Sequence, residues 1–541
     1  MDEAIARHNA GDLAAAESLY RHVLQGDPGN LAALVYLGAI ALGRGDTTTA
    51  VDYADRALSA SPDHAPAWNI KGLAHARGGE ARAALDCFDR ALARDPQFSD
   101  AAVNRAATLL DLDDARSAAQ ACQAVLNARP DAACQCILGI ALLTQDRTAE
   151  ALAAFDAALA MAPGMAEAHN GRANVLRHLG RVEEAILGYS QAIACNPAFA
   201  DAYNNRAVAW QYLRRIPEAL ADFDAALARA PAHADAHWNR ALVRLLEGNY
   251  AQGWPDYEWR WRSAVMRRHA RNFPVPQWRG EDIAGKTILI HAEQGLGDVL
   301  QFCRYVPLVA ARGARVVLEV HKPVRRLLGT LGGGAIVVAS GEATPPFDVH
   351  CPMLSLPPAF GTTVATIPAA IPYLAADPAL TAAWRAKLGP RLRPRIGVVW
   401  AGRPDNQNDT NRSMPVETLA PWLAAGVEVH CLQKDVSADD RAWAEARGVV
   451  FHDQDLGDFA DTAALATAMD VVVSVCTAVA HLAGALGLPT WVALCFAADW
   501  RWFMERADSP WYPTARLFRQ STPGDWALVA TAIAAELRKL Q

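Results

Sequence analysis

A short glycine-containing segment, 291–300 (HAEQGLGDVL), carries residues that could take part in chemistry. It follows an apolar run, Thr287–Ile290, that predicts a buried parallel strand, and the residues after it can form a helix. In a strand–loop–helix of this kind, free backbone N–H groups at the helix N-terminus can bind an anion. Gly295 and Gly297 would let a substrate approach the backbone, because neither has a Cβ, and Asp298 would lie near the mouth of a cleft. A tight turn in any doubly wound domain explains the GxGD pattern equally well.

A second stretch with the same layout begins at the apolar run Asp470–Val475 and continues through Cys476. A helix is predicted to start just after it, so the backbone N–H groups of Thr477, Ala478 and Val479 would point toward an anion. His481 falls on the first turn of that helix, where it could touch a phosphate or could pack in the core.

Cationic and amide side chains follow two further predicted strands. Arg403 and Arg412 lie in a loop after the strand that ends near Trp400, and guanidinium groups bind oxyanions through paired hydrogen bonds. Gln433 and Lys434 end the next strand along the chain. Because the carboxyl ends of parallel strands meet at one edge of a sheet, we expect these residues at the same rim.

The composition is that of a globular protein with several domains: 541 residues, 52% apolar and 20% charged. The net charge of −7 gives no reason to expect nucleic acid or an anionic membrane as a partner. No apolar run reaches membrane-spanning length and the acidic start Met1–Glu3 gives no secretory signal, so we expect a cytoplasmic protein. The ten cysteines are scattered, which fits a reducing compartment, and no motif predicts a bound metal or cofactor.

The N-terminal half is a repeat array. Proline recurs 33 or 34 residues apart, at Pro28, Pro62, Pro96, Pro130, Pro163, Pro197 and Pro231. This period predicts a helical solenoid, and the repeated residues resemble the tetratricopeptide (TPR) repeat over residues 1–262. The resemblance places the first helix of each repeat along a groove, where recurring asparagines could grip an extended polypeptide backbone: Asn69, Asn104, Asn170, Asn204, Asn205 and Asn239. These asparagines could equally be solvated or make local helix contacts.

Arginines recur beside the asparagines, at Arg105, Arg172, Arg206 and Arg240, and we interpret them as a solvated or ion-paired face. Near the end of the array, Trp254, Trp259 and Trp261 carry too much apolar surface for an exposed solenoid end. They predict a contact with the following domain.

From Lys286 the pattern changes to short aliphatic strands alternating with helices, which predicts parallel sheets covered by helices. The candidate strands are Thr287–Ile290, Arg315–Val320, Ala335–Val338, Arg395–Trp400, Val427–Leu432, Val449–Phe451, Val471–Val475 and Thr490–Leu494, and a proline-rich stretch from Pro345 to Pro372 interrupts the pattern. The expected organisation is a TPR solenoid at 1–262, a linker at 263–284, and two Rossmann-like domains. We place the acceptor-side domain at 285–388 and the nucleotide-sugar-side domain at 389–541. A cleft between two such domains is a common ligand site.

Residues from about 285 to the end resemble heptosyltransferase-related glycosyltransferases of the GT-B type. The resemblance is carried by Gly297–Leu300, Trp400–Gly402, Asn411–Ser413, Thr477–Leu482 and the tail that contains Arg501. It implies that Asp298 is the general base, with Glu293 and His291 as alternatives in the same loop. It also implies that the Thr477–His481 stretch and Arg501 bind the donor, although Cys476 replaces the family's aspartate.

Together these features predict a metal-independent protein O-glycosyltransferase whose solenoid binds a protein acceptor. The architecture is similar to bacterial TPR-linked flagellin glycosyltransferases, which implies flagellin as the acceptor and a CMP-linked nonulosonic acid such as pseudaminic acid as the donor. Two alternatives stay open. One is a non-catalytic TPR scaffold with a degenerate transferase domain, favoured by Cys476. The other is a heptosyltransferase-like enzyme that acts on a glycan.

Overall fold

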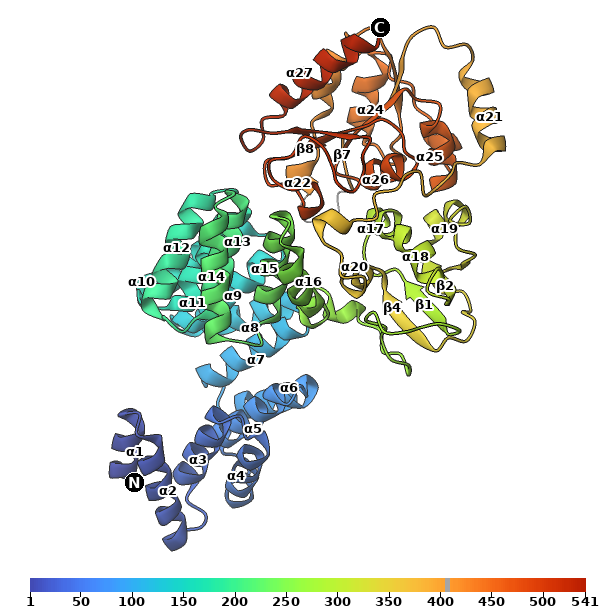
Figure 1. Ribbon diagram of the computed structural model, residues 1–541. Helices are drawn as coiled ribbons and strands as arrows, with labels where there is room; N and C mark the ends of the chain where they lie inside the picture. Colours follow the sequence, from blue (N-terminus) through green and yellow to red (C-terminus); the bar gives the residue numbers. More distant parts are fainter. Residues whose placement is uncertain (404–408) are drawn as a thin grey trace. The chain divides into compact units, whose positions relative to one another are not determined.

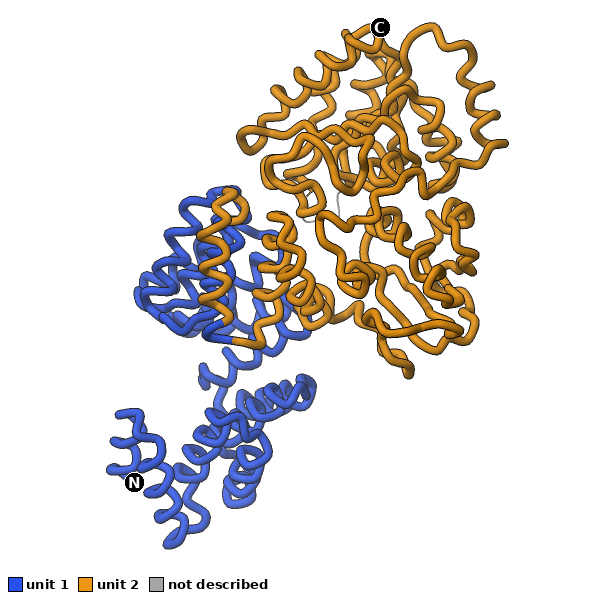
Figure 2. Tube along the Cα trace, in the orientation of Figure 1, with its two compact units in different colours: residues 1–210, 228–230 blue, residues 211–227, 231–541 orange. Residues whose placement is uncertain are grey.

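The structure is a computed structural model that describes residues 1–403 and 409–541. Residues 404–408, part of the predicted anion-handling loop, lie outside the described residues. The chain divides into two compact units: residues 1–210 with 228–230, and residues 211–227 with 231–541 (Figure 2). The second unit therefore contains the last helices of the array together with all the β-strands.

Residues 1–257, all of them described, form sixteen helices (Figure 1). Their bounds are α1 (Asp2–Asn9), α2 (Leu13–Gly26), α3 (Leu31–Gly43), α4 (Thr47–Ala60), α5 (Ala65–Arg77), α6 (Ala81–Arg94), α7 (Ser99–Asp111), α8 (Ala115–Ala128), α9 (Ala132–Thr144), α10 (Thr148–Met161), α11 (Ala166–His178), α12 (Val182–Cys195), α13 (Ala200–Tyr212), α14 (Ile216–Arg229), α15 (Ala234–Leu246) and α16 (Tyr250–Tyr257). The periodic prolines all fall in the short connections between one helix pair and the next. This confirms the predicted helical repeats.

Small residues let the helices of the array pack around buried aromatic rings. Phe88 and Phe155 are fully buried. A Cβ on Gly72 would lie 2.5 Å from the Phe88 ring, and a Cβ on Gly139 would lie 2.8 Å from the Phe155 ring. Glycine is required at these helix positions because the ring occupies the space that any side chain would need.

Three of the four recurring arginines form the same ion pair, in agreement with the predicted solvated or ion-paired face. Each of the three pairs with an aspartate sixteen residues earlier at a nitrogen–oxygen distance of 2.6 Å: Arg105–Asp89, Arg172–Asp156 and Arg240–Asp224. Lys71 and Asp55 form the same pair at 2.6 Å. Arg206 differs, because its Nη1 donates to Ser190 Oγ at 2.9 Å.

Two parallel sheets follow the array (Figure 1). The N-terminal sheet has the order β3-β2-β1-β4 and the C-terminal sheet the order β6-β5-β7-β8-β9. The strand bounds are β1 (Thr287–His291), β2 (Arg315–Val320), β3 (Ile336–Ala339), β4 (Val349–Pro352), β5 (Arg395–Val399), β6 (Glu428–Cys431), β7 (Val471–Val475), β8 (Thr490–Leu494) and β9 (Ala515–Arg519). The helices of this region are α17 (Leu296–Phe302), α18 (Val306–Ala310), α19 (Lys322–Leu328), α20 (Leu356–Ala359), α21 (Pro378–Leu388), α22 (Asp409–Arg412), α23 (Ala420–Leu423), α24 (Ala438–Glu445), α25 (Phe459–Ala466), α26 (Ala478–Ala485) and α27 (Trp526–Leu537).

One predicted strand is wrong and two strands were missed. Residues 449–451 form only a single bridge, between Val450 and His430, at the outer edge of β6. Strand β4 lies in the proline-rich stretch, where proline cannot donate to a sheet and the sequence therefore indicated loop. Strand β9 lies at the outer edge of the C-terminal sheet, beside β8.

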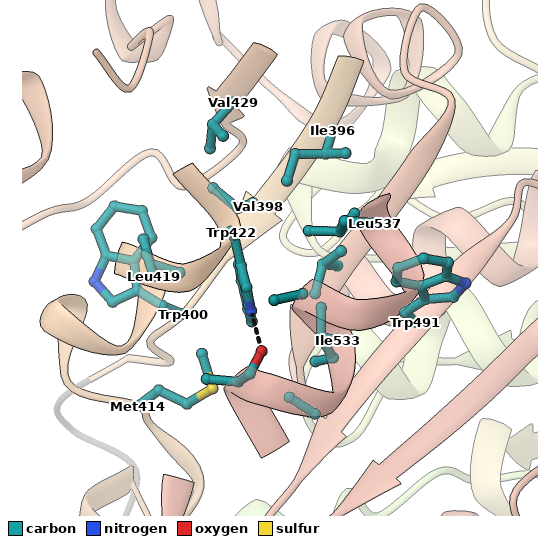
Figure 3. Close-up of a cluster of buried hydrophobic side chains, with 14 of the residues drawn as sticks. Ile396, Val398, Trp400, Met414, Leu419, Trp422, Val429, Trp491, Ile533 and Leu537 are labelled. Carbon is teal, nitrogen blue, oxygen red and sulfur yellow. Dashed lines mark hydrogen bonds between the residues drawn. The ribbon is translucent and has the colours of Figure 1, made fainter. Parts of the chain in front are cut away.

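The core of the C-terminal sheet is built from aliphatic strand residues and tryptophans (Figure 3). Ile396 and Val398 of β5 project toward Ile533 of α27, and the Trp422 indole Nε1 donates to the Ala530 carbonyl at 2.9 Å. This packing fixes β5 and its neighbours, whose carboxyl ends carry the predicted donor-binding residues. Among the described residues, no helix combines the length and the apolar character needed to cross a bilayer.

Candidate functional site

We place the candidate ligand site at the carboxyl edge of the C-terminal sheet. Ligands of open parallel sheets bind where the strand order reverses, and here the reversal falls between β5 and β7. The loop after β5 is held by Gln433, whose Oε1 accepts from the backbone N–H of Trp400 at 2.6 Å and of Ala401 at 3.1 Å. This amide therefore fixes the backbone at the start of the loop after β5.

Arg412, the last residue of α22, is half-buried and lies against Gly402, which belongs to the loop after β5. A Cβ on Gly402 would collide with the Arg412 guanidinium, so the glycine is required for this contact. Asp409 orients the arginine, because its Oδ1 accepts from Arg412 Nε at 3.1 Å. Ser413 Oγ in turn donates to Asp409 at 2.9 Å and accepts from the Gly402 N–H at 2.8 Å. A guanidinium held in this way is positioned to bind an oxyanion.

The other two predicted cations of this rim are exposed. Arg403 directly follows Gly402, and Lys434 follows β6. The Lys434 ammonium donates to the Gly457 carbonyl at 3.1 Å. The structure thus brings all three cations to the loops at one edge of the sheet.

The loop after β7 leads into helix α26, and β7 pairs directly with β5. Thr477 precedes the helix, and no side chain of the described residues caps its N-terminus. The Ser474 and Thr477 hydroxyls lie 3.0 Å apart, which fixes the turn. The first N–H groups of the helix, including those of Ala478 and Val479, are the groups that an anion would meet there.

Cys476 is half-buried and packs against a tryptophan. Its Sγ accepts from the Trp502 indole Nε1 at 3.0 Å, and burial raises the pKa of the thiol to about 12. The thiol is therefore neutral at physiological pH and contributes no negative charge at this position.

His481 is buried where the region of the N-terminal sheet meets the region of the C-terminal sheet. Its Nδ1 lies 2.9 Å from the Tyr512 hydroxyl, and its ring stacks on Trp502 with centroids 5.3 Å apart. Burial lowers the pKa of the imidazole well below its usual value, so the ring is neutral. A Cβ on Gly297 would lie 2.9 Å from the ring, and this contact accounts for the glycine within the protein itself.

Asp298 joins the N-terminal to the C-terminal domain. Helices α17 and α26 pack together (Figure 1), and the Asp298 Oδ1 accepts from Arg501 Nη2 at 2.5 Å. Its Oδ2 accepts from the Gly295 N–H at 2.7 Å, which caps α17. Burial raises the pKa of this carboxyl, and the Arg501 charge opposes that rise. Both oxygens are therefore occupied in this arrangement.

Arg501 is a buried hub with three further hydrogen bonds. Its Nε donates to Gln301 Oε1 at 2.8 Å, and its Nη1 donates to both oxygens of Asp499 at 2.9 and 3.1 Å. The guanidinium lies 4.5 Å from the Trp500 ring centroid. In this structure the arginine binds protein carboxylates on both sides of the domain junction.

The two alternative bases lie deeper in the N-terminal domain. The Glu293 carboxylate accepts hydrogen bonds from Arg260 Nε at 2.8 Å and from Arg260 Nη2 at 3.0 Å. It also accepts one from the Leu354 N–H at 2.8 Å. His291 Nε2 lies 3.3 Å from His350 Nδ1, and burial lowers the pKa of His291 to about 3. Both side chains are committed to internal contacts.

The asparagines of the solenoid pair with one another across adjacent repeats. Asn104 Nδ2 donates to Asn69 Oδ1 at 3.0 Å, and Asn205 Nδ2 donates to Asn170 Oδ1 at 3.0 Å. The six predicted acceptor-binding asparagines divide into buried Asn69 and Asn204, and half-buried Asn104, Asn170, Asn205 and Asn239. Each pair uses one N–H group of the donating amide and the carbonyl oxygen of the accepting amide, so the pair itself does not use the donor's second N–H group or either N–H group of the acceptor.

Several residues of the domain junction were missed from the sequence. Arg501 contacts Gln301 and Asp499, and His481 contacts Tyr512, yet none of these three partners was predicted as a site residue. The aromatic-rich tail around Trp500–Trp502 was the available signal. Among the described residues, no three His, Cys, Asp or Glu side chains gather closely enough to hold a metal ion.

Comparisons with known proteins identify the repeats. Tetratricopeptide-repeat models match residues 8–74, 70–133, 138–202 and 204–253. The chain is also similar to Protein FlbA of Caulobacter vibrioides, with 28% identity over 556 residues that cover 97% of this chain and 87% of the relative.

Solved structures give weaker likenesses. An APC/C hetero-tetramer structure, Cut9-Hcn1, matches with a TM-score of 0.40 and 17% identity over 46% of this chain and 49% of that one. A tetratricopeptide repeat protein from Parabacteroides merdae matches with a TM-score of 0.36 and 19% identity over 42% of this chain and 91% of that one.

The fold and the repeat models together define the class. The chain is a tetratricopeptide-repeat protein whose solenoid is followed by a region with two parallel sheets. A solenoid of this kind is a plausible protein-binding surface, because stacked repeats present an extended face.

Proposed function

We propose that this protein is a protein O-glycosyltransferase that transfers a sugar from a nucleotide-sugar donor to a serine or threonine hydroxyl. In this proposal the solenoid binds the protein acceptor, and the two α/β domains form a metal-independent GT-B unit. The resemblance described above suggests flagellin as acceptor and a CMP-linked nonulosonic acid such as pseudaminic acid as donor.

One observation carries the proposal: the chemistry of the segments that follow β5 and β7. The uncapped N-terminus of α26 follows β7, and the oriented Arg412 guanidinium lies in the segment after the neighbouring strand β5. Both features bind oxyanions, and a leaving nucleotide presents phosphate oxygens on which negative charge grows during transfer. Preorganised donors of this kind stabilise the transition state without a metal.

Asp298 remains the best candidate for the base, because it lies where the two α/β domains meet. Burial raises the pKa of its carboxyl, which makes the carboxylate a stronger base than an exposed aspartate. Its contact with Arg501 must open for the carboxylate to reach an acceptor hydroxyl. Glu293 and His291 are weaker candidates, since Glu293 is paired with Arg260 and the pKa of His291 lies near 3.

A non-catalytic TPR scaffold is the competing function, and two contacts favour it. Asp298 has both oxygens occupied, and Cys476 is half-buried against Trp502 where the resemblance expects a donor-binding aspartate. A degenerate site of this kind would bind no nucleotide.

Nucleotide binding separates the two functions. Full-length protein is mixed with CMP, UDP, ADP or GDP at 1 mM, and its melting temperature is measured. A transferase is stabilised by one of them, by about 2.7 kcal/mol when the nucleotide is at a hundred times its Kd. Release of the same nucleotide from its sugar donor in the presence of acceptor protein then tests transfer.

Arg412→Gln removes the proposed phosphate contact and should abolish the nucleotide-dependent shift. Arg447→Gln is the matched control, because Arg447 is exposed and its Nη1 donates only to the Trp443 carbonyl of its own helix region. No shift with any nucleotide for a folded protein refutes the transferase and leaves the scaffold.

A further inference from the structure

One position of the solenoid repeat is filled by a large side chain in every repeat but one. It is the fourth residue of the first helix in each pair, counted from the helix start in α3, α5, α7, α9, α11, α13 and α15. The residues are Leu34, Trp68, Ala102, Gln135, His169, Tyr203 and His237. Ala102 in α7 is the exception.

The ring nitrogens at this position have a common partner. Each lies within hydrogen-bond distance of the carbonyl of the repeat's proline, six residues earlier in the chain: Trp68 and Pro62 at 2.9 Å, His169 and Pro163 at 2.8 Å, His237 and Pro231 at 2.9 Å. The ring therefore lies in the groove between neighbouring repeats and binds the polar group at its end.

Arginines from the second helix of the pair cover some of these rings. Arg229 lies 4.1 Å from the Tyr203 centroid, and its Nε also donates to the Pro197 carbonyl. Arg90 lies 4.8 Å from the Trp68 ring. In these repeats the groove is filled by an aromatic ring under a cation.

At Ala102 the corresponding space is a cavity of about 380 Å³. Pro96, six residues before Ala102, lines it, as do apolar side chains of α6 and α8 such as Leu92 and Val125. Ala128 also lines it, and Ala128 is the fourteenth residue of α8, where α14 carries Arg229. Ala102 and Ala128 thus stand at the positions where α13 and α14 carry the Tyr203 ring and the Arg229 guanidinium.

The cavity keeps the polar groups that recognise an aromatic ring. Arg105 and Arg129 line it, and Arg105 is held by Asp89 at 2.6 Å. Among the described residues, no side chain donates a hydrogen bond to the Pro96 carbonyl. Guanidinium groups complement the negative face of an aromatic ring, and a carbonyl complements an indole N–H or a phenol O–H.

We propose that this cavity is a docking site for the tryptophan or tyrosine side chain of a protein partner. The partner's ring takes the place that Trp68 occupies in the neighbouring repeat, and its polar edge donates to the Pro96 carbonyl. The volume is in the range of pockets that bury a small ligand, which suits one large side chain. The site goes beyond the proposed transferase and holds equally for a scaffold.

Small aromatic molecules test the site in the full-length protein. Indole is titrated by ligand-observed NMR, alongside 1-methylindole, which has the same ring but no N–H. Indole should bind saturably in the millimolar range, and 1-methylindole several-fold more weakly because it cannot donate to the carbonyl.

Two variants fill the cavity from within. Ala102→Trp restores the ring of α5, and Ala128→Arg restores the guanidinium of α14; each should weaken indole binding at least tenfold. Gln135→Trp is the matched control, because it places a tryptophan at the same repeat position outside the cavity lining, and it should leave binding unchanged. If Ala102→Trp fails to fold by circular dichroism, Ala128→Arg decides.

Absence of saturable indole binding to the folded wild-type protein overturns the proposal. Equal binding to the wild type and to the folded cavity-filling variants does so too, since the ring would then bind elsewhere. Neither result depends on nucleotide binding, so the outcome is independent of the transferase proposal.

Discussion

At the junction between the solenoid and the α/β region, replacing Arg260 should destabilise the protein more than replacing any other single residue. The Arg260 side chain is fully buried and makes five hydrogen bonds: two to Glu293, and one each to Glu258, Ser355 and the Tyr257 carbonyl. Arg260→Met keeps a similar length but leaves the Glu293 carboxylate, 1% exposed, without its counter-charge.

The expected loss is about 3–5 kcal/mol, because removing one partner of a buried ion pair leaves an uncompensated charge. That is a large part of the roughly 5–15 kcal/mol that stabilises a typical domain. Urea-induced unfolding followed by tryptophan fluorescence measures it. The double variant Arg260→Met/Glu293→Gln should recover about 2 kcal/mol, since no charge is then buried alone.

The loss should also depend on pH. Burial raises the pKa of Glu293 above its usual value, and Arg260 opposes that rise, so Arg260→Met raises the pKa further. The folded variant then holds a proton that the unfolded chain has released, and stability falls as pH rises through this window. The variant should be closest to wild type near pH 5 and least stable at pH 8.

Arg262→Met is the matched control, because Arg262 is exposed and only covers the Trp259 ring at 4.7 Å. It should change stability by less than about 0.5 kcal/mol. A loss below about 1 kcal/mol for Arg260→Met, or a loss that does not grow with pH, would refute the buried-pair reasoning.

Two further outcomes follow from packing and burial. Gly171→Ala should destabilise the solenoid by about 1–3 kcal/mol in thermal unfolding, because the new Cβ would collide with the Phe155 ring. Gly164→Ala should be nearly neutral, because the space around Gly164 is open. Equal losses for the two variants would contradict this account. Burial raises the pKa of the Cys476 thiol to about 12. Cys476 should therefore react with iodoacetamide at pH 8 far more slowly than the exposed Cys195, as measured by mass spectrometry. Faster labelling of Cys476 would show that its contact with Trp502 is open.

The sequence determined the repeats and most strands because those signals are local. The spacing of the prolines sets the turns between helix pairs, and aliphatic runs such as Arg315–Val320 and Val471–Val475 coincide with β2 and β7. Ion pairing of the recurring arginines could also be predicted, since a fixed repeat places each arginine beside the same helix of the preceding unit. Strand β4 could not, because its residues lie in a proline-rich stretch and become a strand only by pairing with β1.

The candidate site divides in the same way. The sequence identified Asp298, Arg501, His481 and Gly297 as important, since each lies in a recognisable motif. Only the tertiary structure decided that Asp298 binds Arg501, 203 residues away, and that Gly297 accommodates the His481 ring. Such pairings depend on how the regions of the two sheets meet. They escape prediction because burial and charge are set by the side chains brought together there, whereas a motif specifies only its own local geometry.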